Sequence, residues 1–389
     1  MIKKFILLVF LIICVSLFCC AKFFENKSQQ DVVIQFASWG SESEVSILKP
    51  VINQFEKENP QIKIDFMHIP QNYFQKIHLL FASNTAPDIV FLNNHYLPIY
   101  ANAGVLEDLT SLDSVFEYEN FYKKAIQALT WNEKIYAVPR DVSNLVIFYN
   151  KNIFDKYGVS YPKKDWTIDE FLIMAKKLTH LPDVFGVSFE DEPLFYLPYL
   201  ASFGVENFKN LDDEKMREGL SFYADIRNKY HVAPYKQESA SATMAQMFLQ
   251  QRIAMHLSGR WLVPKYRQEA DFDWDVVEFP RGIYNGNLID ASGWAITKSS
   301  KYKAEAMKFV KYLSSQESIK EFSKSGLIVP ARIDVANSIV FLDNKSPKSS
   351  YVFLEIIEKS RPTPVSVDFK QVLDKLKIKT EQKFNQFDK

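Results

Sequence analysis

The chain has 389 residues, of which 47% are hydrophobic and 24% are charged, a composition typical of about two folded domains rather than of a disordered chain. Lys plus Arg and Asp plus Glu number 47 each, so the net charge is zero and the basic surface that nucleic-acid binding requires is not expected. Glycine occurs 11 times, which argues against glycine-rich phosphate loops as a central device.

The first twenty residues have the pattern of a secretory leader. Lys3 and Lys4 are followed by the apolar run of residues 5–15, which is shorter than the roughly 20 residues that a membrane-spanning helix needs. All three cysteines lie in this segment, so the remainder of the chain has no disulfide, thiol nucleophile or thiolate metal ligand. We therefore interpret residues 1–20 as a signal peptide.

A leader that ends at cysteine resembles the lipobox of bacterial lipoproteins, in which the cysteine becomes the lipidated first residue. Cys20 is the predicted lipidation site and Cys19 is the alternative. An ordinary signal peptide or an uncleaved anchor is the competing interpretation. Residues 21–30 are mostly polar and are predicted to form a tether between the lipid and the folded part.

The folded part opens with an alternation of strands and helices. The β-rich run at residues 31–39 and the alternating apolar residues at 62–66 predict two strands, and the continuous apolar run at 88–92 predicts a third. Helical apolar spacing at 45–55 and 74–81 predicts the intervening helices. A βαβαβ start indicates an open, parallel α/β sheet, whose ligands bind beyond the carboxyl ends of the strands.

The later part of the chain continues the mixture. Thr167 and Glu170 have the spacing of a capping box, as do Ser314 and Glu317 ahead of a helix that ends at Gly326. The other expected elements are a helix at 242–251, a strand at 252–258, a strand that ends at 295–296, and helices at 306–313 and 369–376. No linker is evident, so two lobes would be interwoven by several chain crossings.

Enzyme motifs are absent from the sequence. The glycines form neither GxGxxG nor a phosphate-binding loop, no serine lies in GxSxG, and the histidines show no HExxH pattern. Carboxylate clusters occur at residues 190–192 and 271–275, and two positioned carboxylates would suffice for a glycosidase. Solvated loop charges are the simpler interpretation, so we predict no catalytic residue, no metal and no cofactor.

Six segments, taken in order, carry a resemblance to extracellular solute-binding proteins of family 1, the sugar-binding component of ABC importers. They are residues 36–39 (FASW), 82–90 (ASNTAPDIV), 132–139 with 147–151 (NEKIYAVP and IFYNK), 162–171 (PKKDWTIDEF), 251–261 (QRIAMHLSGRW) and 291–296 (ASGWAI) with 326–330. Asn84 stands where the family has glycine in the second segment.

The resemblance implies an α/β, periplasmic-binding-protein-like type II fold: two α/β lobes joined by hinge crossings, with a ligand cleft between them. Residues 31–141 plus 290–332 would form lobe 1, and residues 142–289 plus 333–389 would form lobe 2. The crossings are expected near residues 141–145, 285–290 and 332–341. The implied protein is a monomer without enzymatic activity, exported and lipid-anchored to the cell membrane, which delivers a carbohydrate to ABC transporter permease subunits.

A sugar-binding cleft needs aromatic planes for the C–H faces of the sugar and fixed polar groups for its hydroxyls. The resemblance, with the strand ends above, assigns these roles to Trp39, Glu42, Asn94, His95, Asp141, Ser143, Trp261, Asp290 and Trp294. Asp290 stands where relatives often have glycine.

Arg361 resembles an arginine that pairs with phosphate in glycerol-3-phosphate-binding relatives, and is the tenth candidate. A phosphorylated polyol receptor is therefore the first alternative to a neutral-sugar receptor. A secreted carbohydrate-active enzyme is the second alternative, and a sensor or adhesin that reuses the fold is the third.

Overall fold

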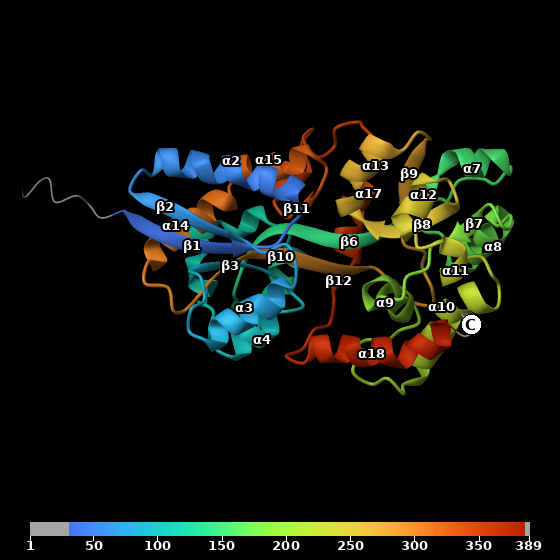
Figure 1. Cartoon of the computed structure of the whole chain (residues 1–389), viewed down its shortest axis with the longest axis horizontal. Helices are drawn as coiled ribbons and strands as arrows, with labels where there is room; N and C mark the ends of the chain where they lie inside the picture. The colour runs from blue at the N-terminus through green and yellow to red at the C-terminus, as the bar shows by residue number, and fades with distance from the viewer. Residues whose placement is uncertain (1–30, 386–389) are drawn as a thin grey trace, which may run out of the picture.

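The computed structural model describes residues 31–385 (Figure 1). The predicted signal peptide 1–20, with its lipidation site Cys20, and the predicted tether 21–30 therefore lie outside the described residues. Within residues 31–385, no helix combines the length and the apolar character that crossing a membrane would need.

The predicted βαβαβ start is confirmed. Strand β1 (Val32–Ser38) lies between β2 (Ile62–His68) and β3 (Ile89–Asn93) and is parallel to both. Helices α2 (Glu42–Glu58) and α3 (Tyr73–Ala82) make the connections. The carboxyl ends of β1 and β3 therefore lie at the same edge of the sheet.

Helix α2 begins earlier than its apolar spacing predicts, because Ser41 caps it. The Ser41 hydroxyl accepts a hydrogen bond from the backbone N–H of Glu44, and the helix ends at Glu58, with Asn59 as its C-cap before Pro60. The first turn thus contains Glu42 and Glu44, which lie on different faces of the helix because two residues correspond to about 200° of rotation.

Two strands connect the halves of the molecule. The first part of β6 (Val138–Asn150) pairs with β10 (Leu288–Ile296) and β11 (Val329–Pro330), and its last six residues pair with β8 (Ile253–Gly259) and β9 (Trp274–Glu278). Strand β10 is antiparallel to both β3 and β6. The path through the sheet is β2-β1-β3-β10-β6-β8-β7, with β7 at Phe185–Val187.

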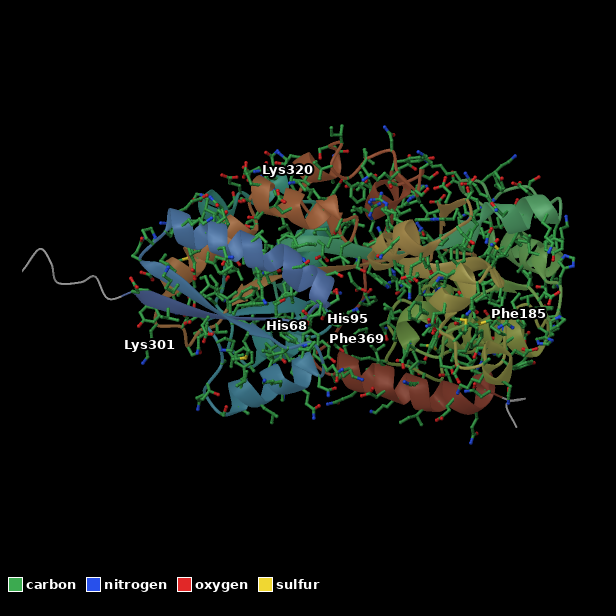
Figure 2. All side chains as sticks on the ribbon, turned by 45° about the horizontal axis from the view of Figure 1, so that its top comes forward. His68, His95, Phe185, Lys301, Lys320 and Phe369 are labelled. Carbon is green, nitrogen blue, oxygen red and sulfur yellow. The ribbon has the colours of Figure 1, made fainter. Side chains whose placement is uncertain are left out.

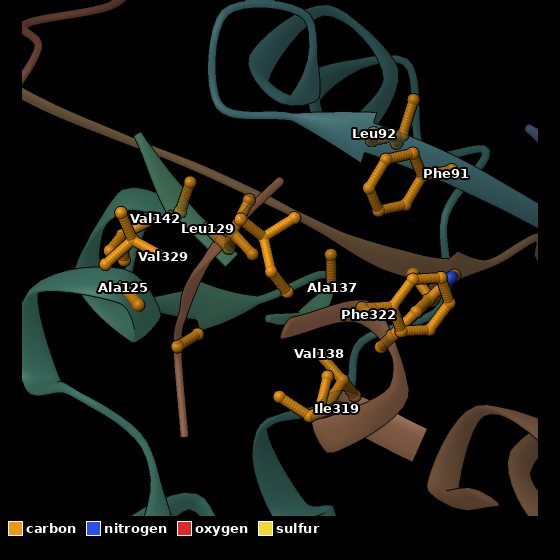
Figure 3. Packing of buried hydrophobic residues seen from close by; sticks show 14 of the residues in the cluster. Phe91, Leu92, Ala125, Leu129, Ala137, Val138, Val142, Ile319, Phe322 and Val329 are labelled. Atoms are coloured by element: carbon orange, nitrogen blue, oxygen red, sulfur yellow. The ribbon is translucent and has the colours of Figure 1, made fainter. Parts of the chain in front are cut away.

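The hydrophobic core forms two clusters. The larger one includes Phe91, Leu129, Val138 and Phe322 around β3, β6 and β10, as the close view in Figure 3 shows. The second lies around α9 (Pro193–Ser202), α10 (Glu214–Asn228) and α18 (Phe369–Phe384), where aromatic rings contact one another. In Figure 1, α18 runs along the lower edge of the molecule, below α9.

One predicted cap is wrong by a residue. The N-cap of α15 (Gln316–Lys324) is Ser315, whose hydroxyl accepts from the N–H of Ser318, whereas the Ser314 hydroxyl donates to the carbonyl of Lys311 at the end of α14 (Lys303–Leu313). The capping box of Thr167 and Glu170 is confirmed at the start of α8 (Ile168–Leu178).

The predicted helix at 242–251 is shorter than expected, because Thr243 caps α12 (Met244–Leu249). The remaining helices and short strands complete the chain. They are α4 (Leu97–Asn102), η1 (Thr110–Leu112), α5 (Asp113–Phe116), η2 (Tyr118–Asn120), α6 (Lys123–Ala128), β4 (Thr130–Trp131), β5 (Lys134–Ile135), α7 (Lys151–Lys156), α11 (Lys236–Ser239), η3 (Arg260–Leu262), α13 (Val263–Glu269), α16 (Ile333–Ala336), α17 (Val352–Lys359) and β12 (Arg361–Pro362).

Candidate ligand-binding site

A row of polar side chains runs across the strands that join the two halves. In the antiparallel pair of β6 and β10, Ser143 lies opposite Asp290 and Asp141 lies opposite Ser292. Residues directly opposite each other in an antiparallel pair project from the same face of the sheet. These four side chains therefore form one polar strip on a single face, at the junction of the two hydrophobic clusters.

An irregularity in β6 adds a fifth polar group. Between Ser292 and Gly293 the register shifts, so that Gly293 pairs with Pro139 and Arg140 has no partner residue on β10. Such a bulge lets two consecutive side chains project from the same face. Arg140 and Asp141, although neighbours in sequence, are accordingly hydrogen-bonded to each other.

A cavity of about 270 Å³ lies over one end of this strip. Its lining residues come from the end of β1, the start of α2, β6, η3, β10 and the region of β11. Four of the predicted ligand residues line it together, although they come from three distant segments of the chain: Trp39, Asp141, Ser143 and Trp261. The rest of the lining is Glu44, Arg140, Val142, Arg260, Ser292, Leu327, Ile328 and Val329.

The charged part of this cavity is a buried cluster of one arginine and two carboxylates. Arg140 donates from Nη1 to Oε1 of Glu44 and from Nε to Oδ2 of Asp141, and the three side chains are 9%, 12% and 10% exposed. The guanidinium also lies 4.2 Å from the ring centroid of Phe91. The cluster is therefore held rigidly from three sides.

Burial lowers the pKa of Arg140, but the charges of Asp141 and Glu44 outweigh that effect and the net pKa is raised. Burial also raises the pKa of Asp141. Arg140 lowers this pKa, but burial and the nearby charge of Glu44 outweigh that effect, so the net pKa of Asp141 is raised. One guanidinium thus neutralises part of the charge of two desolvated carboxylates and is hydrogen-bonded to both. Fixed charged donors and acceptors of this kind make strong, oriented hydrogen bonds to ligand hydroxyls.

Two tryptophans supply the aromatic surface. The half-buried ring of Trp39 packs against Tyr73, Phe74 and Phe91, with ring centroids 5.1, 5.2 and 4.3 Å away. Trp261 is 36% exposed. Its ring lies over Gly259, where an added Cβ would come within 1.9 Å of it, so glycine is required for this ring position.

Arg260 lines the cavity, and its guanidinium is hydrogen-bonded to neighbouring protein segments. It donates from Nε to the carbonyl of Gly326 and from Nη1 to the hydroxyl of Ser350, and its guanidinium lies 4.1 Å from the Phe341 ring centroid. Burial lowers the pKa of Arg260 to about 9. These contacts indicate that Arg260 connects η3 to the segments that precede β11 and α17.

A second group of predicted residues meets at Asp290. Its Oδ1 accepts from Nδ2 of Asn94 and from Nε2 of His95, each at 2.8 Å. Burial pushes the pKa of Asp290 upward, but His95 and hydrogen bonds from Asn94 and Thr363 outweigh it, so the net pKa lies below its usual range.

His95 also lines a second cavity, of about 210 Å³, between the two halves of the molecule. Figure 2 shows His95 beside Phe369, whose ring centroid lies 5.1 Å from that of the imidazole. The other lining residues come from the loop after β3, α9 and α18: Tyr96, Glu192, Pro193, Leu194, Leu197, Lys370, Leu373, Asp374 and Lys377.

Three predicted residues lie elsewhere. Glu42 projects into solvent, with a side chain that is 90% exposed. Trp294 is 1% exposed and packs in the core against Phe91 and Phe322. Arg361 donates to the carbonyls of Val205 and Glu206 at 2.6 and 3.0 Å, outside the lining of both cavities.

Four polar lining residues are not among the ligand residues predicted from sequence: Glu44, Arg140, Arg260 and Ser292. Two of them could have been found from the sequence. Ser41, as the N-cap, determines on which face of α2 Glu44 lies, and Ser292 lies two residues after Asp290, on the same face of the strand. The register shift that exposes Arg140 to the cavity has no signal in the sequence. Among residues 31–385, no group of three or more His, Cys, Asp or Glu side chains is arranged to hold a metal ion.

Known proteins with similar sequences include two binding proteins of comparable length. A multiple sugar-binding protein from Streptococcus mutans is 26% identical over 336 residues, which cover 79% of this chain and 77% of that protein. An uncharacterized ABC transporter extracellular-binding protein from Pyrococcus horikoshii is 24% identical, over 79% of this chain and 74% of that protein.

Solved structures match over most of the chain. An ABC substrate-binding protein from Listeria monocytogenes in complex with cycloalternan has a TM-score of 0.83 and 28% identity, covering 92% of this chain and 94% of that chain. A maltose-bound MalE3 from T. maritima has a TM-score of 0.78 and 22% identity, covering 91% and 95%. These matches confirm the predicted periplasmic-binding-protein-like type II fold.

The family model for the bacterial extracellular solute-binding protein matches residues 51–347, which include the polar strip and most of the residues that line both cavities. By name, the Streptococcus mutans relative is a sugar-binding protein, and the Pyrococcus horikoshii and Listeria monocytogenes relatives are binding proteins of ABC transporters. The chain belongs to the bacterial extracellular solute-binding protein family.

Proposed function

We propose that this protein is the carbohydrate-binding component of an ABC importer, and that it captures a sugar or oligosaccharide between two closing lobes and delivers it to permease subunits. The observation that carries the proposal is the shared cavity of Trp39, Trp261 and the Arg140–Glu44–Asp141 cluster. The relatives support it, since one is named a multiple sugar-binding protein and another was solved with cycloalternan.

The composition of the cavity suits a sugar better than other small solutes. Aromatic rings stack on the C–H faces of a pyranose, and the arginine and carboxylates offer both donors and acceptors for its hydroxyls. A volume of about 270 Å³ lies near the lower end of the range for small-molecule sites, so this cavity fits one or two sugar rings. The second cavity, beside His95, offers room for a longer ligand.

The charges favour a neutral ligand over a phosphorylated polyol. Arg361, which the sequence suggested for phosphate, is engaged by two backbone carbonyls outside both cavities. The strip between the strands contains Asp141 and Asp290, with Glu44 next to the first. Carboxylates placed beside a bound phosphate repel it, so a glycerol-phosphate ligand ranks second.

We extend the proposal to the lobes and the anchor. Lobe 1 would comprise residues 31–141 plus 290–332, and lobe 2 residues 142–289 plus 333–389. The first boundary lies close to the point where β6 changes its partner from β10 at Asn144 to β8 at Leu145, which supports this division. Membership of an extracellular family supports export, and Cys20 is the proposed lipid attachment site of a monomeric receptor. Incorporation of radiolabelled palmitate into the wild type, and its loss in Cys20→Ala, tests the anchor.

A thermal-shift screen of the purified protein tests the solute class. The panel contains maltose, maltotriose, other neutral oligosaccharides and glycerol 3-phosphate. A ligand at 100 times its dissociation constant stabilises a single-site protein by about 2.7 kcal/mol, which is readily visible as an increase in melting temperature. Stabilisation by a neutral sugar without its hydrolysis supports the proposal. Stabilisation by glycerol 3-phosphate alone, or turnover of the sugar, contradicts it.

A further inference from the structure

His95 and Asp290 form a hydrogen-bonded pair at the edge of the second cavity. The distance from Nε2 of His95 to Oδ1 of Asp290 is 2.8 Å, and the two side chains are 18% and 17% exposed. The same oxygen accepts from Asn94, whose own Oδ1 accepts from the N–H of Ala291. Asp290 is thus held in place by donors from the loop after β3.

The chemistry of this pair restricts the imidazole. An ionised carboxylate only accepts hydrogen bonds, so Nε2 of His95 must carry the proton that it shares with Asp290. In a neutral imidazole, one ring nitrogen is a donor and the other is an acceptor. Nδ1 of His95 is therefore an acceptor.

Nδ1 has no hydrogen-bond partner among residues 31–385, and it is not one of the enclosed atoms that lack a partner in that part of the chain. His95 lines the second cavity, and its ring is fixed on the other side by Phe369. The charged residues that share this cavity satisfy one another, because Lys377 is bonded to Glu192 and Lys370 to Asp374. They leave the free nitrogen of His95 available.

We propose that Asp290 is a positioning residue that fixes the tautomer of His95, so that Nδ1 of His95 is a dedicated hydrogen-bond acceptor for a hydroxyl group of the bound solute in the second cavity. This inference rests on the proposed function for its ligand, but the tautomer itself does not depend on any ligand. It gives Asp290 an indirect role in place of the direct ligand contact predicted from sequence.

The direct test is ¹⁵N NMR of the histidine rings in the ligand-free protein at pH 8, because the nitrogen shifts report which ring nitrogen carries the proton. The His95 signals are assigned by their loss in His95→Phe. The wild type should show His95 protonated at Nε2 and unprotonated at Nδ1. Asp290→Ala should lose this preference, and Asp290→Asn should retain it because the amide oxygen still accepts. Protonation at Nδ1 in the wild type overturns the proposal, even if Asp290→Ala fails to fold.

Calorimetry with maltotriose then tests the acceptor role. Asp290→Ala should bind about 3- to 10-fold more weakly than the wild type, as expected for one lost hydrogen bond, with Asp290→Asn close to the wild type. Asp183→Asn, in an exposed turn, is the control for a lost carboxylate. Equal affinity of all variants, with the expected tautomer present, overturns the ligand contact. No binding to any variant, the wild type included, contradicts the choice of sugar and leaves the NMR result to decide the tautomer.

Discussion

Replacing Arg140 by methionine should destabilise the fold strongly, because it leaves two carboxylates buried without their cation. Glu44 and Asp141 are 12% and 10% exposed, and both are hydrogen-bonded to the same guanidinium. Removing one partner of a buried ion pair costs about 3–5 kcal/mol. We expect Arg140→Met to lose a similar amount of unfolding free energy, measured by urea denaturation at pH 7.5.

Two further variants separate charge burial from lost packing. The triple variant Glu44→Gln, Arg140→Met, Asp141→Asn removes all three charges and should recover most of the loss. Lys134→Met breaks an exposed ion pair with Asp108, with side chains 55% and 39% exposed, and should cost less than about 1 kcal/mol.

The stability difference between Arg140→Met and the wild type should depend on pH, and the direction of this dependence tests whether buried charge is its cause. Without the guanidinium, the folded-state pKa of Asp141 lies above its unfolded value, so protonation favours the folded state of the variant. The stability deficit of Arg140→Met relative to the wild type should therefore shrink as the pH falls from 7.5 to 5. A deficit under about 1 kcal/mol at pH 7.5, or a triple variant as unstable as the single one, would show that the buried charges do not depend on the guanidinium.

Three other variants test the roles of Trp261, Trp294 and Glu190. Trp261→Ala should weaken binding of the sugar selected by thermal shift at least tenfold in calorimetry, with partial recovery in Trp261→Phe; unchanged affinity would contradict its stacking role. Trp294→Ala should lose about 3–5 kcal/mol in urea denaturation because the ring is 1% exposed; a loss of affinity without a loss of stability would instead make it a ligand residue. Burial and the neighbouring Asp191 and Glu192 raise the pKa of Glu190 to about 7, so its ionisation should cost the wild type about 3 kcal/mol of stability as the pH rises from about 4.5 to about 7. Glu190→Gln should lack that decline when the unfolding free energy is measured by urea denaturation across the same pH range. The same pH dependence in the variant and the wild type would be inconsistent with a buried carboxyl.

The early elements were predictable because their signals are local. Apolar alternation and helical spacing predict β1, α2, β2, α3 and β3 within a few residues, and the ends of β1 and β3 correctly indicate a shared edge. Asn94 and His95 are neighbours in sequence, and they meet the distant Asp290 in one hydrogen-bonded group. Their roles in ligand binding stay predictions.

The face of a helix that is turned to the cavity, and the depth to which a strand side chain is buried, were harder to predict. Glu44 rather than Glu42 lines the cavity because the Ser41 cap sets where α2 begins. Trp294 follows Ser292 by two residues on β10 but lies deeper, under the same Phe91 and Phe322 rings that contact the Arg140 guanidinium. Alternation specifies the face of a strand, whereas depth depends on which helices cover it, and that information is not local.

A crystal structure of the protein with the neutral oligosaccharide that stabilises it most would locate the bound sugar. We expect a sugar ring against Trp261 in the cavity between the two halves, with hydroxyls bonded to the Arg140–Glu44–Asp141 cluster. A sugar bound away from this cavity, or one whose hydroxyls contact none of these three residues, would contradict this expectation.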